Sequence, residues 1–211
     1  MKKKLKNQAI LDLRNYSAKA LSEIDLIANV AVIILPSDAA ADWSEAYGRI
    51  AKKNVASSIQ LPIGETLHMI NGSGFFTDNT VENGVYMVNG DALIDTKEKT
   101  VKLFLNGSAI IINDSPCRVL QCNGDMMRVD CERYQYFDNI IELTPDVIAH
   151  LERGITIIAG NKIMLDKALT PEQLEEKEVS FAAGNKILCS DAAYGYVVAH
   201  SVCGNKIERY E

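Results

Sequence analysis

The chain has 211 residues, of which 47% are hydrophobic and 24% are charged, and its formal net charge is −6. A chain of this length and composition can bury a full hydrophobic core, and its acidic balance argues against nucleic acid as a partner. No long apolar stretch follows the lysine-rich start, so we expect neither a signal peptide nor a membrane segment, and a cytoplasmic location.

The first 53 residues are predicted to form an N-terminal cap and the first irregular coils. Residues 17–24 form a predicted helix, placed to cover the open end of the coils that follow. Residues 37–53 carry Trp43, Tyr47 and Ile50 at helical spacing, which predicts a second helix with one apolar face.

Asparagines recur along the chain, each between two β-prone apolar runs. From Asn54 to Asn139 the steps are roughly 16 to 18 residues, and a fixed period of this size is a signature of stacked repeats. The recurring asparagines are Asn29, Asn54, Asn71, Asn89, Asn106, Asn123, Asn139, Asn161, Asn185 and Asn205. We therefore predict that residues 54–143 form regular coils, with corners about 4.8 Å apart and asparagine side chains hydrogen-bonded along the stack.

Four of these asparagines are followed by glycine, at positions 72, 90, 107 and 124. Both residue types tolerate the left-handed backbone region, so the pair predicts a sharp, left-handed corner. The pair is also a hairpin signal. A meander of hairpins, however, would not require one turn chemistry at one constant period, and the solenoid is the favoured interpretation.

The positions beside these corners are apolar in successive repeats, as the enclosed core of stacked strands requires. The residue before each asparagine is predicted to point inward. The positions three and four residues after each asparagine are also assigned to the core. These three columns are Ile70, Val88, Leu105 and Cys122; Gly74, Ala92, Ala109 and Met126; and Phe75, Leu93, Ile110 and Met127.

The C-terminal residues 144–211 are predicted to form coils with helical insertions. The sequence Gly-Asn-Lys-Ile occurs three times, at residues 160–163, 184–187 and 204–207. Thr144 and Pro145 open one predicted helix, which Gly154 can close. Thr170 and Gln173 form a predicted capping box for another.

These observations predict a single all-β domain over residues 1–211, a parallel β-solenoid of about nine or ten coils. We expect a right-handed, single-stranded β-helix with short inserted helices. Over residues 54–142, the short coil, apolar interior and Asn/Gly corners resemble the bactofilin-type solenoids, which are polymer-forming cytoskeletal proteins. Bactofilins resemble bare solenoids, whereas this chain carries helices and a predicted cap, which would block end-to-end growth. A leucine-rich-repeat-like horseshoe is the alternative fold, although the repeat is short for it.

The most suggestive polar column is Ser73, Asp91, Ser108 and Asp125, two residues after each central asparagine. Asp91 and Asp125 would lie about 10 Å apart along the stack, near the spacing of an inverting glycosidase pair. The alternative is that Ser and Asp bind local backbone amides after a turn, and we favour it. The five cysteines show no zinc or disulfide pattern, so no metal or cofactor is expected. Cys117 and Cys131 have no assigned role.

An outward apolar row consists of Met69, Met87 and Phe104, and Gln121 ends it. Such a row must be covered, either by the helix around Trp43 or by a second chain. The sequence therefore predicts a non-enzymatic scaffold or protein-interaction solenoid, with a homodimer through these three residues and an unidentified protein partner. A carbohydrate-active or carbohydrate-binding β-helix is the alternative function.

Overall fold

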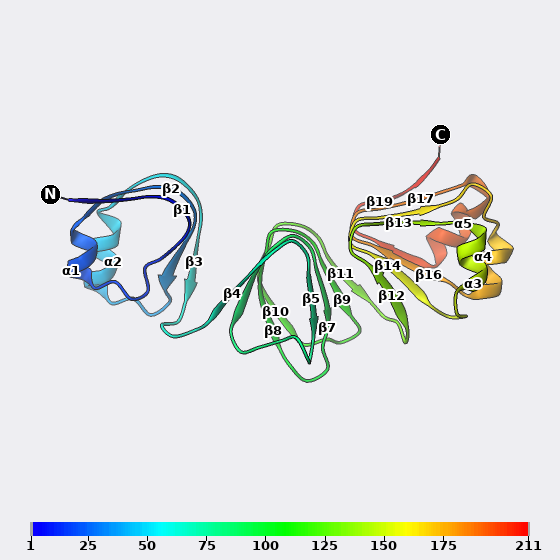
Figure 1. Cartoon of the computed structure of the whole chain (residues 1–211), viewed down its shortest axis with the longest axis horizontal. Coiled ribbons are helices and arrows are strands. Elements are labelled where there is room, and N and C mark those ends of the chain that lie inside the picture. Colours follow the sequence, from blue (N-terminus) through cyan, green and yellow to red (C-terminus); the bar gives the residue numbers. More distant parts are fainter. Residues whose placement is uncertain (1, 211) are drawn as a thin grey trace. The chain divides into compact units, whose positions relative to one another are not determined.

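The computed structural model describes residues 2–210, and the chain divides into two compact units between Glu65 and Thr66 (Figure 1). Within residues 2–210 every strand pairing is parallel, and the strands stack in chain order into five sheets. The prediction of a parallel β-solenoid is confirmed at this level. The paired strands form three stacks, one in the first unit and two in the second.

The first unit is a sheet of long strands in the order β1-β2-β3, joined by two helices. Its elements are β1 (Lys3–Asp12), α1 (Ala18–Ser22), β2 (Ile24–Pro36), α2 (Ala41–Gly48) and β3 (Ala51–Leu61). Each strand has one asparagine with a positive φ, at Asn7 (57°), Asn29 (55°) and Asn54 (53°). Their amides form a ladder, with Nδ2–Oδ1 distances of 2.8 Å between Asn29 and Asn7 and 3.0 Å between Asn54 and Asn29.

The two helices of the first unit pack on its own core. Ser17 caps α1 by accepting a hydrogen bond from the Ala20 amide, and α1 lies between β1 and β2 instead of before the first strand. The second helix is shorter than predicted, because residues from Ala51 onward pair with β2. Trp43 and Ile50 are buried in the core of this unit.

In the second unit, residues 67–129 form a first stack of four coils. Each coil contributes one strand to each of two sheets. One sheet contains β4 (Leu67–Asn71), β6 (Val85–Asn89), β8 (Val101–Leu105) and β10 (Cys117–Cys122). The other contains β5 (Gly74–Thr77), β7 (Ala92–Asp95), β9 (Ala109–Ile112) and β11 (Met126–Val129).

The predicted superposition of asparagines at one corner of this stack is confirmed. Asn71 and Asn89 are in register. The Asn106 amide donates to Asn89 over 3.2 Å, and the Asn123 amide donates to Asn106 over 2.9 Å. The predicted left-handed backbone at these four asparagines is wrong. Among residues 2–210, asparagine has a positive φ only at Asn7, Asn29, Asn54 and Asn113.

Close stacking explains three of the four glycines of this corner, Gly90, Gly107 and Gly124. Gly72, in the first coil, instead has a φ of 112° and open space where a Cβ would lie. A Cβ at Gly107 would lie 2.3 Å from the Gly90 carbonyl oxygen, and one at Gly124 would lie 2.7 Å from that of Gly107. These contacts are too short for any side chain, so each glycine lets the next coil approach. Gly184 and Gly204 have the same role in the second stack.

Residues 134–209 form a second stack of four coils, in which a helix follows each of the first three strand pairs (Figure 1). One sheet contains β12 (Tyr134–Phe137), β14 (Thr156–Ala159), β16 (Ser180–Ala183) and β18 (Ser201–Cys203). The other contains β13 (Ile140–Leu143), β15 (Lys162–Leu165), β17 (Lys186–Cys189) and β19 (Lys206–Arg209). The helices are α3 (Pro145–His150), α4 (Pro171–Lys177) and α5 (Asp191–Ala199).

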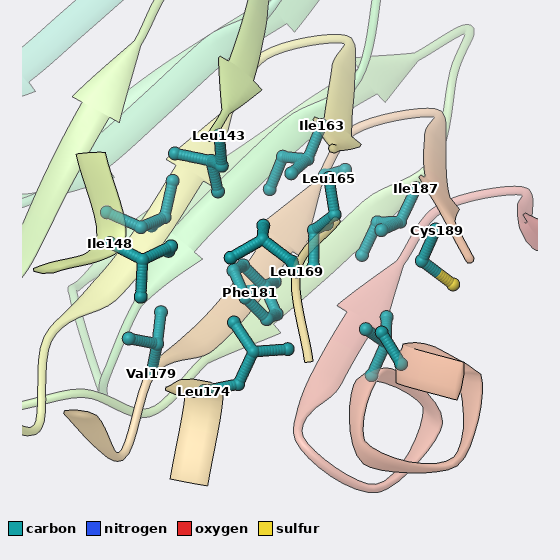
Figure 2. Close-up of a cluster of buried hydrophobic side chains, with 14 of the residues drawn as sticks. Leu143, Ile148, Ile163, Leu165, Leu169, Leu174, Val179, Phe181, Ile187 and Cys189 are labelled. Carbon is teal, nitrogen blue, oxygen red and sulfur yellow. The ribbon is translucent and has the colours of Figure 1, made fainter. Parts of the chain in front are cut away.

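Both helix starts predicted in this region are confirmed. Thr144 caps α3, and Thr170 with Gln173 forms the capping box of α4. Gly154 does not close α3, which ends at His150. The sequence interpretation missed α5, which Ser190 caps. Buried residues of these helices, including Ile148 and Leu174, pack against strand residues such as Phe181 in one core (Figure 2).

The two stacks of the second unit meet through the outer faces of their sheets. Leu93, Ile110 and Met127, from the first stack, form a buried cluster with Ile158 and Ala182 of the second. The assignment of the Leu93 column to the enclosed core is therefore wrong. It faces away from the interior, because Ala92 and Ile94 on either side belong to the inner cluster.

Two other residues assigned to the core are exposed. Met126 lies at the open end of the first stack and is 59% exposed, and Phe75 is 47% exposed. Both lie on terminal strands of their sheet, β11 and β5, which have a neighbour on one side only. A residue on a terminal strand lacks the packing that the next coil would supply.

Candidate functional site

The Asp91 column is part of the backbone stacking. The Asp91 carboxylate accepts a hydrogen bond from the Ser108 amide at 2.8 Å, and the Ser108 hydroxyl accepts one from the Asp125 amide at 3.2 Å. Each side chain therefore binds the backbone one coil further along. This is the arrangement expected of polar residues that follow a turn. The carboxylate-pair hypothesis for Asp91 and Asp125 stays untested.

Tyr136 approaches the same corner from the second stack. Its hydroxyl donates to the Asp138 carboxylate over 3.4 Å. Burial, followed by the charges of Asp138 and Asp91, raises the pKa of Tyr136 to about 12. Near neutral pH the phenol is therefore protonated, and it can act as a hydrogen-bond donor to a carboxylate.

A second tyrosine–aspartate pair links the two stacks. The Tyr134 hydroxyl donates to the Asp95 carboxylate at 2.7 Å, and burial together with this carboxylate raises the pKa of Tyr134. Tyr136 and Tyr134 alternate with Gln135 on β12, so both face the same side. The alternation in the sequence shows that Tyr134 and Tyr136 share one face of β12. It does not show which sheet packs against that face.

The outward row is present as predicted. Met69, Met87 and Phe104 are in register on the neighbouring strands β4, β6 and β8, and Gln121 continues the row on β10. Met69 is 41% exposed, and Met87 and Phe104 are partly buried. The row lies on the outer face of this sheet, because its neighbours Val88 and Leu105 belong to the inner core.

The apolar residues of the helix around Trp43 pack into the core of the first unit. The Trp43 side chain is buried there, and its Nε1 donates to the Tyr16 carbonyl at 2.8 Å. Tyr47 stacks on Trp43, with ring centroids 5.4 Å apart. These contacts already account for the apolar spacing in the sequence.

The histidines lie in separate places. His68 stacks on Tyr86, His150 is on α3, and His200 follows α5. Among residues 2–210, no group of three His, Cys, Asp or Glu side chains could hold a metal ion. Burial raises the pKa of the thiols of Cys117 and Cys131, so neither has the low pKa of a reactive cysteine.

A depression of about 330 Å³ lies at the start of the second stack, and the sequence interpretation did not identify it. Apolar side chains form most of it, with Gln135, Asp146 and His150 as its polar residues. The His150 Nδ1 lies 2.8 Å from the Asp146 carbonyl oxygen. Since a carbonyl only accepts, this contact places the proton of a neutral ring on Nδ1.

Comparisons with known proteins give no relative: no family model, no curated protein and no solved structure matches this chain. Over residues 2–210, no helix is both long and apolar enough to cross a membrane.

Proposed function

We propose that this chain is a non-enzymatic scaffold or interaction protein that pairs with a second copy of itself. The observation that carries the proposal is the in-register row of Met69, Met87 and Phe104 on the outer face of the β4–β6–β8–β10 sheet. Stacked apolar side chains on an exposed sheet face favour contact with another surface.

The same stack offers an internal comparison. Its second sheet also carries an outward apolar row, which includes Leu93 and Ile110, and a sheet of the second stack buries that row. One outer face of these coils therefore packs against a second sheet through its apolar row. The Met69 row has the same pattern and lies on the opposite sheet of the coil.

A closed two-fold dimer is the simplest assembly, because one self-complementary patch then satisfies both copies. Each row would contact its symmetry mate, with the flexible methionine side chains adapting to the partner surface. Any other protein partner would compete for the same row.

Light scattering on the wild type and on Phe104→Glu tests this proposal. We expect a wild-type dimer and a folded monomer for the variant, since a buried, unpaired carboxylate opposes association. Phe75→Glu is the matched control. It places the same change on the other sheet, at a side chain that is 47% exposed, and it should remain dimeric.

Two results would contradict the proposal. A wild type that is monomeric at high concentration has no such interface. A Phe104→Glu variant that unfolds, while Phe75→Glu stays folded, would show that Phe104 belongs to the core of one chain.

We also propose that the coils are right-handed, that the chain is related to the bactofilin-type solenoids, that it folds as a single domain and that it is located in the cytoplasm. The stacked coils with apolar interiors support the kinship. The five free cysteines suit a reducing compartment. Calorimetry of the whole chain tests the single domain, because two separate transitions would show two domains.

A further inference from the structure

Asn-Gly pairs are chemically labile as well as structurally useful. Glycine has no Cβ, so its backbone nitrogen can approach the side-chain carbonyl carbon of the preceding asparagine. This chain has five such pairs, which begin at Asn71, Asn83, Asn89, Asn106 and Asn123. The structure places them in different surroundings.

The ladder restrains the pairs at Asn106 and Asn123. The amide of each of these residues donates to the asparagine one coil earlier, at 3.2 Å and 2.9 Å. The Gly124 nitrogen, which would be the attacking atom at Asn123, donates to the Gly107 carbonyl at 3.0 Å. Cyclisation at these corners would require the coils to separate.

Asn83 lies outside the ladder, in the loop between β5 and β6, and is exposed. No hydrogen bond joins its side chain to any other residue of the described range 2–210. Gly84 has a φ of 136°, a backbone conformation that other residues rarely adopt. The side-chain amide is therefore available, and the next residue has no side chain to block the attack.

His68 contacts the peptide bond that would react. Its Nε2 lies 3.0 Å from the Asn83 carbonyl oxygen, and because a carbonyl only accepts, Nε2 is the donor. The ring is held by stacking on Tyr86, with centroids 4.6 Å apart and an interplanar angle of 20°. Its other nitrogen, Nδ1, lies 3.9 Å from the Glu82 carboxylate.

We propose that Asn83 is a self-modification site, at which the chain deamidates with the help of His68. Water or hydroxide removes the Gly84 amide proton, and the Gly84 nitrogen attacks Cγ of Asn83. The Gly84 N–Cγ bond forms and the Cγ–Nδ2 bond breaks. The side-chain nitrogen leaves as ammonia after taking up a proton, and a five-membered imide remains. One water then opens the imide to aspartate or to its β-linked isomer.

His68 acts on the charge that develops in this step. When the Gly84 nitrogen loses its proton, the negative charge is shared with the Asn83 carbonyl oxygen. The Nε2–H donor already points at that oxygen, so it stabilises the anion without reorganisation. The product carries a new carboxylate next to Glu82, and this changes the charge of the loop.

Peptide mapping by mass spectrometry, over a time course at neutral pH on the full chain, tests the proposal. Asn106 and Asn123 are internal controls with the same dipeptide. We expect deamidation at Asn83 to be at least about tenfold faster than at either control, the factor that corresponds to about 1.4 kcal/mol of barrier.

His68→Phe is the decisive variant, because it keeps an aromatic ring against Tyr86 and removes the donor. We expect it to slow deamidation at Asn83 by about tenfold, the effect of one hydrogen bond to a developing charge. Unchanged slow rates at Asn106 and Asn123 in the same sample show that the stack is still folded. An Asn83 rate equal to that of the controls overturns the proposal, and so does an unchanged or faster rate in His68→Phe.

Discussion

We expect glycine to be the better tolerated substitution at Asn29 and alanine to be the better tolerated substitution at Asn106, as measured by the free energy of unfolding. Each of these side chains makes two ladder hydrogen bonds, one as donor and one as acceptor. Either substitution removes both bonds, at about 0.5–1 kcal/mol each because water can replace them at the exposed corner. The ladder contribution is therefore similar at the two positions.

The backbone contribution differs in sign. Asn29 has a φ of 55°, where alanine is strained by about 1–2 kcal/mol and glycine is not. Asn106 is not among the residues with a positive φ, and there glycine costs about 0.5–1 kcal/mol more than alanine through chain entropy. Asn29→Gly should thus be more stable than Asn29→Ala, and Asn106→Ala more stable than Asn106→Gly.

Denaturant melts measure both differences. The fluorescence of Trp43, the single tryptophan, follows the first unit, and circular dichroism follows the whole chain. The same order of alanine and glycine at the two positions would refute the backbone assignment. Asn29→Ala and Asn106→Ala variants as stable as the wild type would refute the ladder.

Three further expectations follow from single contacts. Leu105→Ala should lower the free energy of unfolding by about 2–5 kcal/mol, because Leu105 is buried in the first-stack core; a near-neutral melt would contradict the inward assignment. The Asp78 carboxylate accepts hydrogen bonds from three backbone amides. These bonds lower the pKa of the Asp78 carboxyl, and the bond from the Lys97 amide has the largest effect. The stabilisation by these bonds is present above the ordinary carboxyl pKa and is lost as the pH falls through the lowered pKa of the folded protein. The difference in unfolding free energy between the wild type and Asp78→Asn should therefore disappear in acid. A difference that does not change with pH would contradict this reasoning. A polysaccharide screen should show no turnover, and turnover abolished by Asp91→Asn or Asp125→Asn would support the carbohydrate alternative.

Features encoded by local chemistry were predictable from the sequence. Thr144 and Thr170 mark their helices because an N-cap needs only a side chain within three residues of a free amide. The corners at Asn89 and Asn106 repeat because an asparagine in each coil lets its side-chain amide bind the one in the neighbouring coil. In contrast, Asn7 was missed as a ladder member, since its strand is rich in lysine and lacks the apolar alternation that marks the others.

The glycines after the corner asparagines were correctly identified as corner residues, but for three of the four the reason that the sequence suggested is not the one that the structure shows. Gly107 and Gly124 follow asparagines, and the pair is typical of left-handed turns. Their actual constraint is the carbonyl of the preceding coil, 2.3 Å and 2.7 Å from where a Cβ would lie. That distance depends on how coils stack, which is not a property of any short segment.

The two outward rows show where sequence reasoning ends for the candidate site. Leu93 and Ile110 lie on one outer face of the coil, and Met87 and Phe104 lie on the other. Both rows read as apolar columns at the repeat period. The first row is covered only because β14 and β16, which lie more than about forty residues later in the chain, pack against it. Periodicity therefore identifies a face that needs a partner, whereas the fold determines whether that partner is the same chain. For the Met69 row, the oligomeric state of Phe104→Glu supplies the missing information.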